Sequence, residues 1–147
     1  METATMGKVF VAAKIENLQD LYEVHLGRLT PDKVRTLDVT DALVDTGAIG
    51  LMIPTRLLPA LGLRPTIQRQ ARGVSGVFTM QLYEVVRLTI QGRECRVEVY
   101  EIPDPNPVLI GQLPLEALDW VVDLVGGKLI GNPDHDGQHI VEVLGVS

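Results

Sequence analysis

The chain has 147 residues, a formal net charge of −6 at pH 7 and a sequence pI near 5.0. Its length suits one domain, 1–147, with a core at about 7–131 and a polar loop and final strand at 132–147. The acidic balance and the lack of a Lys/Arg cluster argue against nucleic acid as a partner. No apolar run is long enough to cross a bilayer and the start lacks a signal-peptide pattern, so we expect a cytoplasmic protein that does not contact membranes.

Short runs of apolar residues, many of them alternating with polar ones, predict a chain made mainly of strands. They lie at 8–15, 21–26, 34–39, 66–70, 77–82, 83–90, 95–102, 108–110, 120–123, 128–130 and 139–144. The first two are expected to pair as a hairpin. Short helices are predicted only after Pro54, where three leucines share a face, and at 114–118. The predicted class is all-β, with sheets that close on themselves or pack face to face.

One carboxylate stands at the end of an apolar run: Asp45 follows Leu43-Val44 and precedes a turn on Thr46-Gly47-Ala48. Aspartate is depleted in strands and costly to bury unpaired, so this position indicates a carboxylate kept for its chemistry. The small residues Gly47 and Ala48 would let another group approach it closely. The alternative interpretation is an ordinary Asx turn that closes a strand.

Two other segments accompany this loop. Leu109-Ile110-Gly111 resembles the Asp45 segment, because it also ends an apolar run in glycine. A Pro-led, Leu-rich segment follows each of these two copies. Only the first copy carries a carboxylate, so the second is expected to pack beside it. Between them, Gly73-Val74-Ser75-Gly76 separates two alternating runs and predicts a hairpin with an exposed, mobile tip.

Together these segments resemble the active-site elements of the retropepsin-like (clan AA) aspartic proteases, including their bacterial single-domain members. The resemblance implies a closed β-barrel with one or two short helices and one half-site per chain. It implies that Asp45 is the catalytic aspartate, that the Thr46 hydroxyl bonds across a dimer axis, and that the Gly47 backbone contacts substrate. It further implies that 73–76 is the tip of a flap over the cleft and that 109–111 packs under the active-site loop.

Catalysis at such a site requires two chains. One carboxylate cannot be general base and general acid in the same step, and the chain has no second Asp-Thr-Gly. Twin Asp45 carboxylates across a two-fold axis would share a proton, as in aspartic proteases generally, and activate a water without metal or other cofactor. The expected function is an aspartic endopeptidase that acts as a homodimer on peptides or proteins. The alternative is a catalytically inactive homodimer that binds peptides or serves in assembly.

Other candidate chemistries are weaker. Asp134-His135-Asp136 with His139 offers metal-ligand types, but its polar Gly/Pro-flanked setting favours a solvated turn. Cys95 is the only cysteine and lies in an alternating run, where a buried inert thiol is expected. His25 is expected to be a surface or satisfied core histidine. Aspartyl-phosphate chemistry is rejected because the sequence does not have an α/β pattern. Ile49 and Gly50 stand where retroviral members often carry acids, so substrate contacts there are expected to differ.

Overall fold

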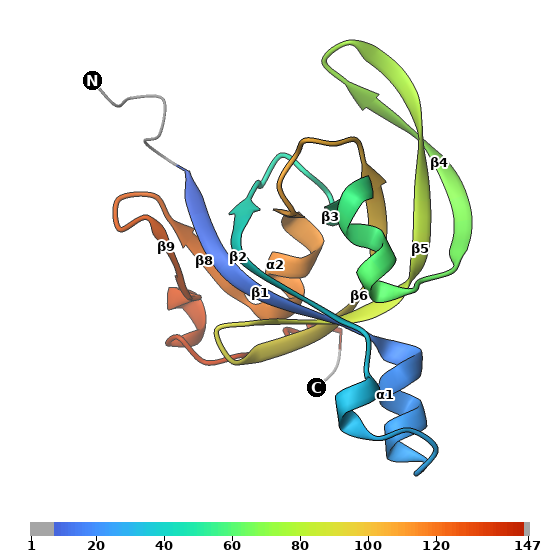
Figure 1. Ribbon diagram of the computed structural model, residues 1–147. Coiled ribbons are helices and arrows are strands. Elements are labelled where there is room, and N and C mark those ends of the chain that lie inside the picture. The colour runs from blue at the N-terminus through green and yellow to red at the C-terminus, as the bar shows by residue number, and fades with distance from the viewer. Residues whose placement is uncertain (1–7, 146–147) are drawn as a thin grey trace.

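The computed structural model describes residues 8–145, and the fold is mostly β, as the sequence predicts (Figure 1). Its main sheet contains β1 (Val9–Asn17), β2 (Thr36–Val44), β3 (Leu51–Pro54), β4 (Pro65–Gly73), β5 (Gly76–Ile90), β6 (Arg93–Ile102) and β7 (Leu109–Ile110). The strand order is β1-β2-β7-β3-β6-β5-β4, and β1 also pairs with β5. The sheet therefore closes into a ring, and the far end of the β4–β5 hairpin projects from it. A separate sheet joins β8 (Trp120–Asp123) to β9 (Lys128–Gly131).

The core lies inside this ring. In β1 the side chains of Val9, Val11, Ala13 and Ile15 are buried while those between them are exposed. Successive residues of a strand point to opposite faces, so this alternation places one face of β1 against the core. Aliphatic side chains from the other strands of the ring meet that face, including the fully buried Leu88. Each fully buried side chain of this size contributes about 1.5–3 kcal/mol to folding.

The predicted strand at 21–26 is wrong, and so is its hairpin with 8–15, because α1 (Leu18–His25) is a helix. The Asn17 side chain accepts a hydrogen bond from the Asp20 amide at 3.0 Å and caps the helix N-terminus. The buried Asp20 carboxylate in turn accepts from Arg35 Nε at 2.8 Å, and this bond lowers its pKa. His25 lies exposed in the last turn of α1.

The other predicted short elements are present. The hairpins at 83–90/95–102 and 120–123/128–130 correspond to β5–β6 and β8–β9. The segment after Pro54 is a 3₁₀ helix (Thr55–Leu61) that ends at Gly62, whose φ of 58° is left-handed. The second predicted helix is α2 (Gln112–Leu118). None of the helices among the described residues is long and apolar enough to span a bilayer.

The predicted final strand at 139–144 is wrong, because none of these residues joins a sheet. Two further 3₁₀ turns occur, at Pro31–Lys33 and, within the predicted polar loop, at Pro133–His135. The tail then folds back on the C-terminal end of α2, where the Ile140 amide donates to Asp119 Oδ2 at 3.1 Å. In a strand the Ile140 amide would donate to the backbone of a neighbouring strand. Here it donates to the Asp119 side chain instead.

Candidate active site

The Asp45 loop begins where β2 leaves the sheet. The short strand β7 lies between β2 and β3, parallel to the first and antiparallel to the second, so that Ile110 faces Val44 on one side and Leu51 on the other. The Asp45 amide donates to the Ile110 carbonyl at 2.9 Å, which continues the β2–β7 pairing by one residue. The two segments that resemble each other in sequence are therefore neighbours, and the apolar one fixes the start of the loop.

The loop holds one oxygen of its own carboxylate. The Gly47 amide donates to Asp45 Oδ1 at 2.9 Å, and the Ala48 amide donates to the Asp45 carbonyl at 3.0 Å. This is the geometry of an Asx turn, so the turn and a catalytic carboxylate are compatible. Asp45 is half-buried, Thr46 and Gly47 are exposed, and Oδ2 has no hydrogen-bond partner among the described residues.

Leu109-Ile110-Gly111, the support segment, and the first residues of α2 hold the other side of the loop. The Gln112 and Leu113 amides donate to the carbonyls of Ala48 and Ile49, both at 2.9 Å, and the Gly111 amide donates to Gly50 at the same distance. A Cβ on Gly111 would stand 2.5 Å from the Ala48 carbonyl oxygen and 2.6 Å from that of Gly50. No side chain fits there, so glycine at 111 is a requirement of packing against the active-site loop.

The acids that retroviral members often carry after the loop have no room at position 50. Gly50 is buried, and a Cβ there would lie 2.7 Å from the ring of Tyr100. Ile49 is exposed and contributes an apolar side chain to the cleft instead. The wall of the cleft next to Asp45 is therefore apolar.

The predicted glycine-flanked hairpin is formed by β4 and β5. Gly73 pairs with Gly76, and Val74 and Ser75 make the turn. Gly76 has φ of 122°, a conformation that residues with a side chain rarely adopt. The hairpin extends beyond the closed part of the sheet (Figure 1), and its tip is exposed.

A cleft of about 610 Å³ lies between the Asp45 loop and this hairpin. Of the predicted site residues, Asp45, Gly47, Ala48, Gly73, Val74 and Leu109 line it, whereas Thr46, Ser75, Gly76, Ile110 and Gly111 do not. Thr46 instead lines a neighbouring hollow with residues of α2 and β8. Ile49, where the sequence led us to expect altered substrate contacts, also lines the cleft. Sequence reasoning missed the remaining lining residues: Met52, Arg69, Gln70, Ala71, Arg72, Phe78, Met80, Tyr100 and Ile102. The Gly73–Gly76 turn indicates that β4 and β5 residues lie beside the cleft, but not which of them line it.

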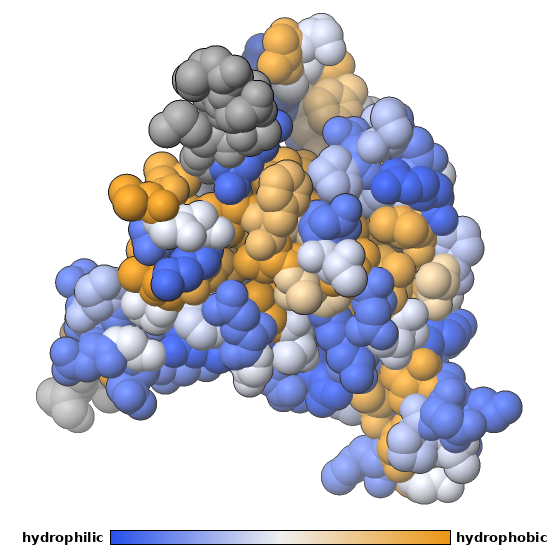
Figure 2. All heavy atoms as spheres, turned by 60° about the vertical axis from the view of Figure 1, so that its left-hand side comes forward, coloured by the Kyte–Doolittle hydropathy of each residue, from blue (hydrophilic) through white to orange (hydrophobic). Residues whose placement is uncertain are grey.

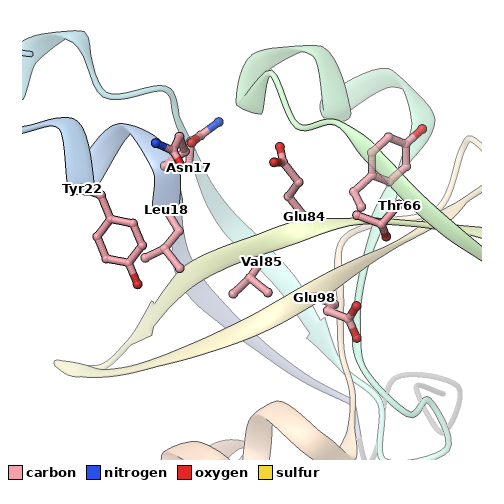
Figure 3. Close-up of a pocket in the computed structure, with 9 residues that line it drawn as sticks. Asn17, Leu18, Tyr22, Thr66, Glu84, Val85 and Glu98 are labelled. Carbon is pink, nitrogen blue, oxygen red and sulfur yellow. The ribbon is translucent and has the colours of Figure 1, made fainter.

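A smaller hollow of about 310 Å³ lies between α1 and β5, away from Asp45 (Figure 3). Tyr22 and Leu18 reach it from the helix, and Glu84 and Val85 from the strand. Glu84 is engaged by Arg64, whose guanidinium donates to it at 2.9 Å and lowers its pKa. The Glu84 carboxylate at this hollow is thus already paired with Arg64.

Cys95 and His135, also considered from the sequence, lie outside the cleft. Burial raises the pKa of the Cys95 thiol to about 11, so the thiol stays protonated at neutral pH. His135 lies between two carboxylates, with Nδ1 2.6 Å from Asp119 Oδ2 and Nε2 2.6 Å from Glu142 Oε1. Within residues 8–145, no group of three His, Cys, Asp or Glu side chains is arranged to hold a metal ion.

A family model described as aspartyl protease matches residues 31–113. The matched region starts before β2, contains the Asp45 loop and the β4–β5 hairpin, and ends just after Gly111. This covers more than half of the chain, and the protein belongs to the retropepsin-like aspartyl protease family. A search of curated proteins gave no match.

Proposed function

We propose that the protein is an aspartic endopeptidase whose active site forms when two copies bring their Asp45 residues together. The observation that carries the proposal is the position of Asp45: it opens into a cleft beneath a glycine-tipped hairpin, with Oδ1 bound by the Gly47 amide. The loop amide orients the carboxylate, and Oδ2 remains available to a water or to a second carboxyl group.

Two copies are needed because peptide hydrolysis requires a base and an acid at the same moment. Asp45 is the only acid among the described residues that line the cleft. With a second Asp45 beside it, repulsion keeps the pair from ionising fully, so the two carboxyls share a proton. The ionised one takes a proton from water as the water attacks the scissile carbonyl, while the protonated one donates its proton to the carbonyl oxygen to form the gem-diol. The carboxyl that took the proton from water then donates it to the leaving amine, and the other recovers its proton from the gem-diol as the carbonyl forms again.

The surface around the loop suits a second copy. Ile49, Leu113 and Val121 are exposed by 54%, 52% and 37% near the loop and on β8, and apolar residues gather on the side turned forward in Figure 2. β8 is paired by β9 along one edge, and no described strand pairs its other edge. A free strand edge with exposed apolar side chains favours association with another chain. Thr46 borders the hollow beside β8, where its hydroxyl would meet the second copy.

The first test is Asp45→Asn, which keeps the shape of the side chain but removes its acid–base chemistry. We expect cleavage of a mixed peptide pool, followed by mass spectrometry, to fall at least about 100-fold because general acid–base catalysis is lost. The matched control is Asp41→Asn, the same change at an exposed position on β2. An Asp45→Asn protein that cuts at the parental rate would show that Asp45 is not the catalyst.

The second test concerns the two-chain site. Excess Asp45→Asn chains should inhibit the parental protein by forming mixed dimers, and specific activity should fall on dilution as dimers dissociate. Sedimentation of a fully active monomer would refute the shared site. A parental protein that cuts nothing in the pool but is stabilised by peptides would support the alternative, an inactive peptide-binding module.

A further inference from the structure

We propose that Arg69 makes the cleft select substrates that carry an acidic side chain a few residues from the scissile bond. This inference rests on the proposed function, because it assigns a preference to the same cleft. The inference is based on the charged residues that line the cleft. Apart from Asp45 these are Arg69 and Arg72, two cations in a chain whose net charge is −6.

The strand register places Arg69 on the face of the hairpin that looks into the cleft. In the β4–β5 ladder Arg69 pairs with Met80, and Ala71 pairs with Phe78. Directly paired residues of antiparallel strands project to the same side of the sheet. Met80 is buried against Met52, so this side is the inner one, and Arg69 shares it.

The opposite face of β4 points outward. Gln70 lies on it and donates to Thr79 at 3.1 Å on the outside of the hairpin, and Arg72 follows Gln70 on the same face by the alternation of the strand. Arg72 also lines the cleft, but from the outward face of β4 and close to the tip. Arg69 is the cation that faces the substrate channel.

Arg69 also lacks the carboxylate partner that most arginines of this chain have. Ion pairs join Arg28 to Glu23, Arg35 to Asp20, Arg56 to Asp104, Arg64 to Glu84, and Arg87 to Glu16 and Glu94. Among the described residues no carboxylate lies within ion-pair distance of Arg69, which is exposed. A guanidinium is always charged and binds a carboxylate in a fixed, two-pronged geometry. A substrate carboxylate is the partner that fits it.

The distance from Arg69 to the tip of the hairpin indicates which residue of the substrate would carry the carboxylate. A strand advances about 3.3 Å per residue, so Arg69 lies about 13 Å along β4 from Gly73 at the tip. The walls nearer Asp45 are apolar, with Ile49, Phe78 and Leu109 among them. An extended peptide would therefore place large apolar side chains next to the scissile bond and the acid roughly two to four residues away.

The experiment uses fluorogenic decapeptides with Leu-Phe at the centre. The peptides come in pairs that differ only by Glu or Gln at one position. That position is the second, third or fourth residue from the central bond, tested separately on each side. We expect kcat/KM for Glu to exceed that for Gln at one or more of these positions by roughly 1.5- to 5-fold, the range for an exposed charge pair. The ratio should fall as salt is added, because exposed charges are screened.

Two variants assign the preference to Arg69. Arg69→Gln should bring the Glu/Gln ratio to about one, and Arg69→Glu should bring it below one, because the new carboxylate repels a Glu peptide. Arg96→Gln is the matched control: it removes the same charge from an exposed position on β6 outside the cleft, and it should keep the parental ratio. An unchanged ratio in Arg69→Gln, or a parental protein that cuts Glu and Gln peptides equally well, would overturn the inference.

A failure of the proposed function would look different. If the parental protein cuts none of the peptides, the same pairs are measured by fluorescence anisotropy for binding to the parental protein and to Arg69→Gln. Tighter binding of Glu peptides that disappears in Arg69→Gln would support the selection by Arg69 without catalysis. Equal affinities for Glu and Gln peptides would refute it.

Discussion

Replacing Gly111 with alanine tests whether the support segment positions the Asp45 loop. The new methyl group would stand 2.5 Å from the Ala48 carbonyl oxygen, 2.6 Å from that of Gly50 and 2.7 Å from the Gly50 nitrogen. These are roughly 0.7 to 0.9 Å short of ordinary contact, which begins at 3.4 Å. All three atoms belong to backbone, so they cannot move aside as a flexible side chain would.

The size of the effect follows from that shortfall. Overpacking of this kind typically costs about 1–3 kcal/mol of folding free energy. For a chain of this length, that corresponds to a fall in Tm of about 3 to 9 °C. Because the displaced atoms belong to the loop that begins with Asp45, the carboxylate should also move. A displacement of about 1 Å can cost on the order of 100-fold in rate.

The assay combines thermal unfolding with cleavage of a peptide substrate. Gly145→Ala is the matched control, because its Cβ would meet nothing within 4 Å and its φ is not left-handed. We expect kcat/KM to fall more in Gly111→Ala than the loss of folded protein at the assay temperature explains. A Gly111→Ala protein with parental Tm and parental kcat/KM would refute the argument that the two segments are packed without spare room.

Two further predictions concern the hairpin and the tail. Alanine at position 76 would be strained at the φ of 122° found there, so Gly76→Ala should lower kcat/KM at least about tenfold. Its Tm should change little, because exposed hairpin tips add little to global stability. Ser75→Ala is the control, and unchanged kinetics in Gly76→Ala would remove the flap assignment. The carboxylates of Glu142 and Asp119 raise the pKa of His135, so its contribution to stability is complete below about pH 6.5 and is lost as the pH rises through the raised value. His135→Gln should therefore flatten the decline of Tm as the pH rises above about 6.5, whereas His25→Gln should not. Equal slopes for His135→Gln and the parental protein would contradict this.

The sequence predicts best what local signals determine. The β4–β5, β5–β6 and β8–β9 hairpins follow from glycine-containing turns between alternating runs, and the position of Asp45 at a strand end follows from the apolar residues before it. The missed helix α1 also had a local signal, because Asn17 and Asp20 have the spacing of an N-terminal cap. Reading 21–26 by alternation alone gave the wrong element.

Other features depend on contacts between distant residues and could not be read locally. The run at 139–144 has strand-like alternation, but a strand needs an edge to pair with, and here the Asp119 carboxylate takes the Ile140 amide instead. Which face of β4 carries Arg69 is settled only by the register with β5 and by the burial of Met80. The inner and outer residues of the cleft are therefore properties of the folded sheet.

The insertion of β7 between β2 and β3 bears on the order in which the molecule folds. Leu43 pairs with Leu109, which lies far along the chain. Bringing two such distant residues together costs conformational entropy, and contacts of this kind form slowly during folding. During synthesis the Asp45 segment is made well before Ile110 and Gly111, which hold it. We infer that a nascent or partly unfolded chain has no assembled catalytic loop, so the chemistry of Asp45 becomes available only after both halves of the sheet have met.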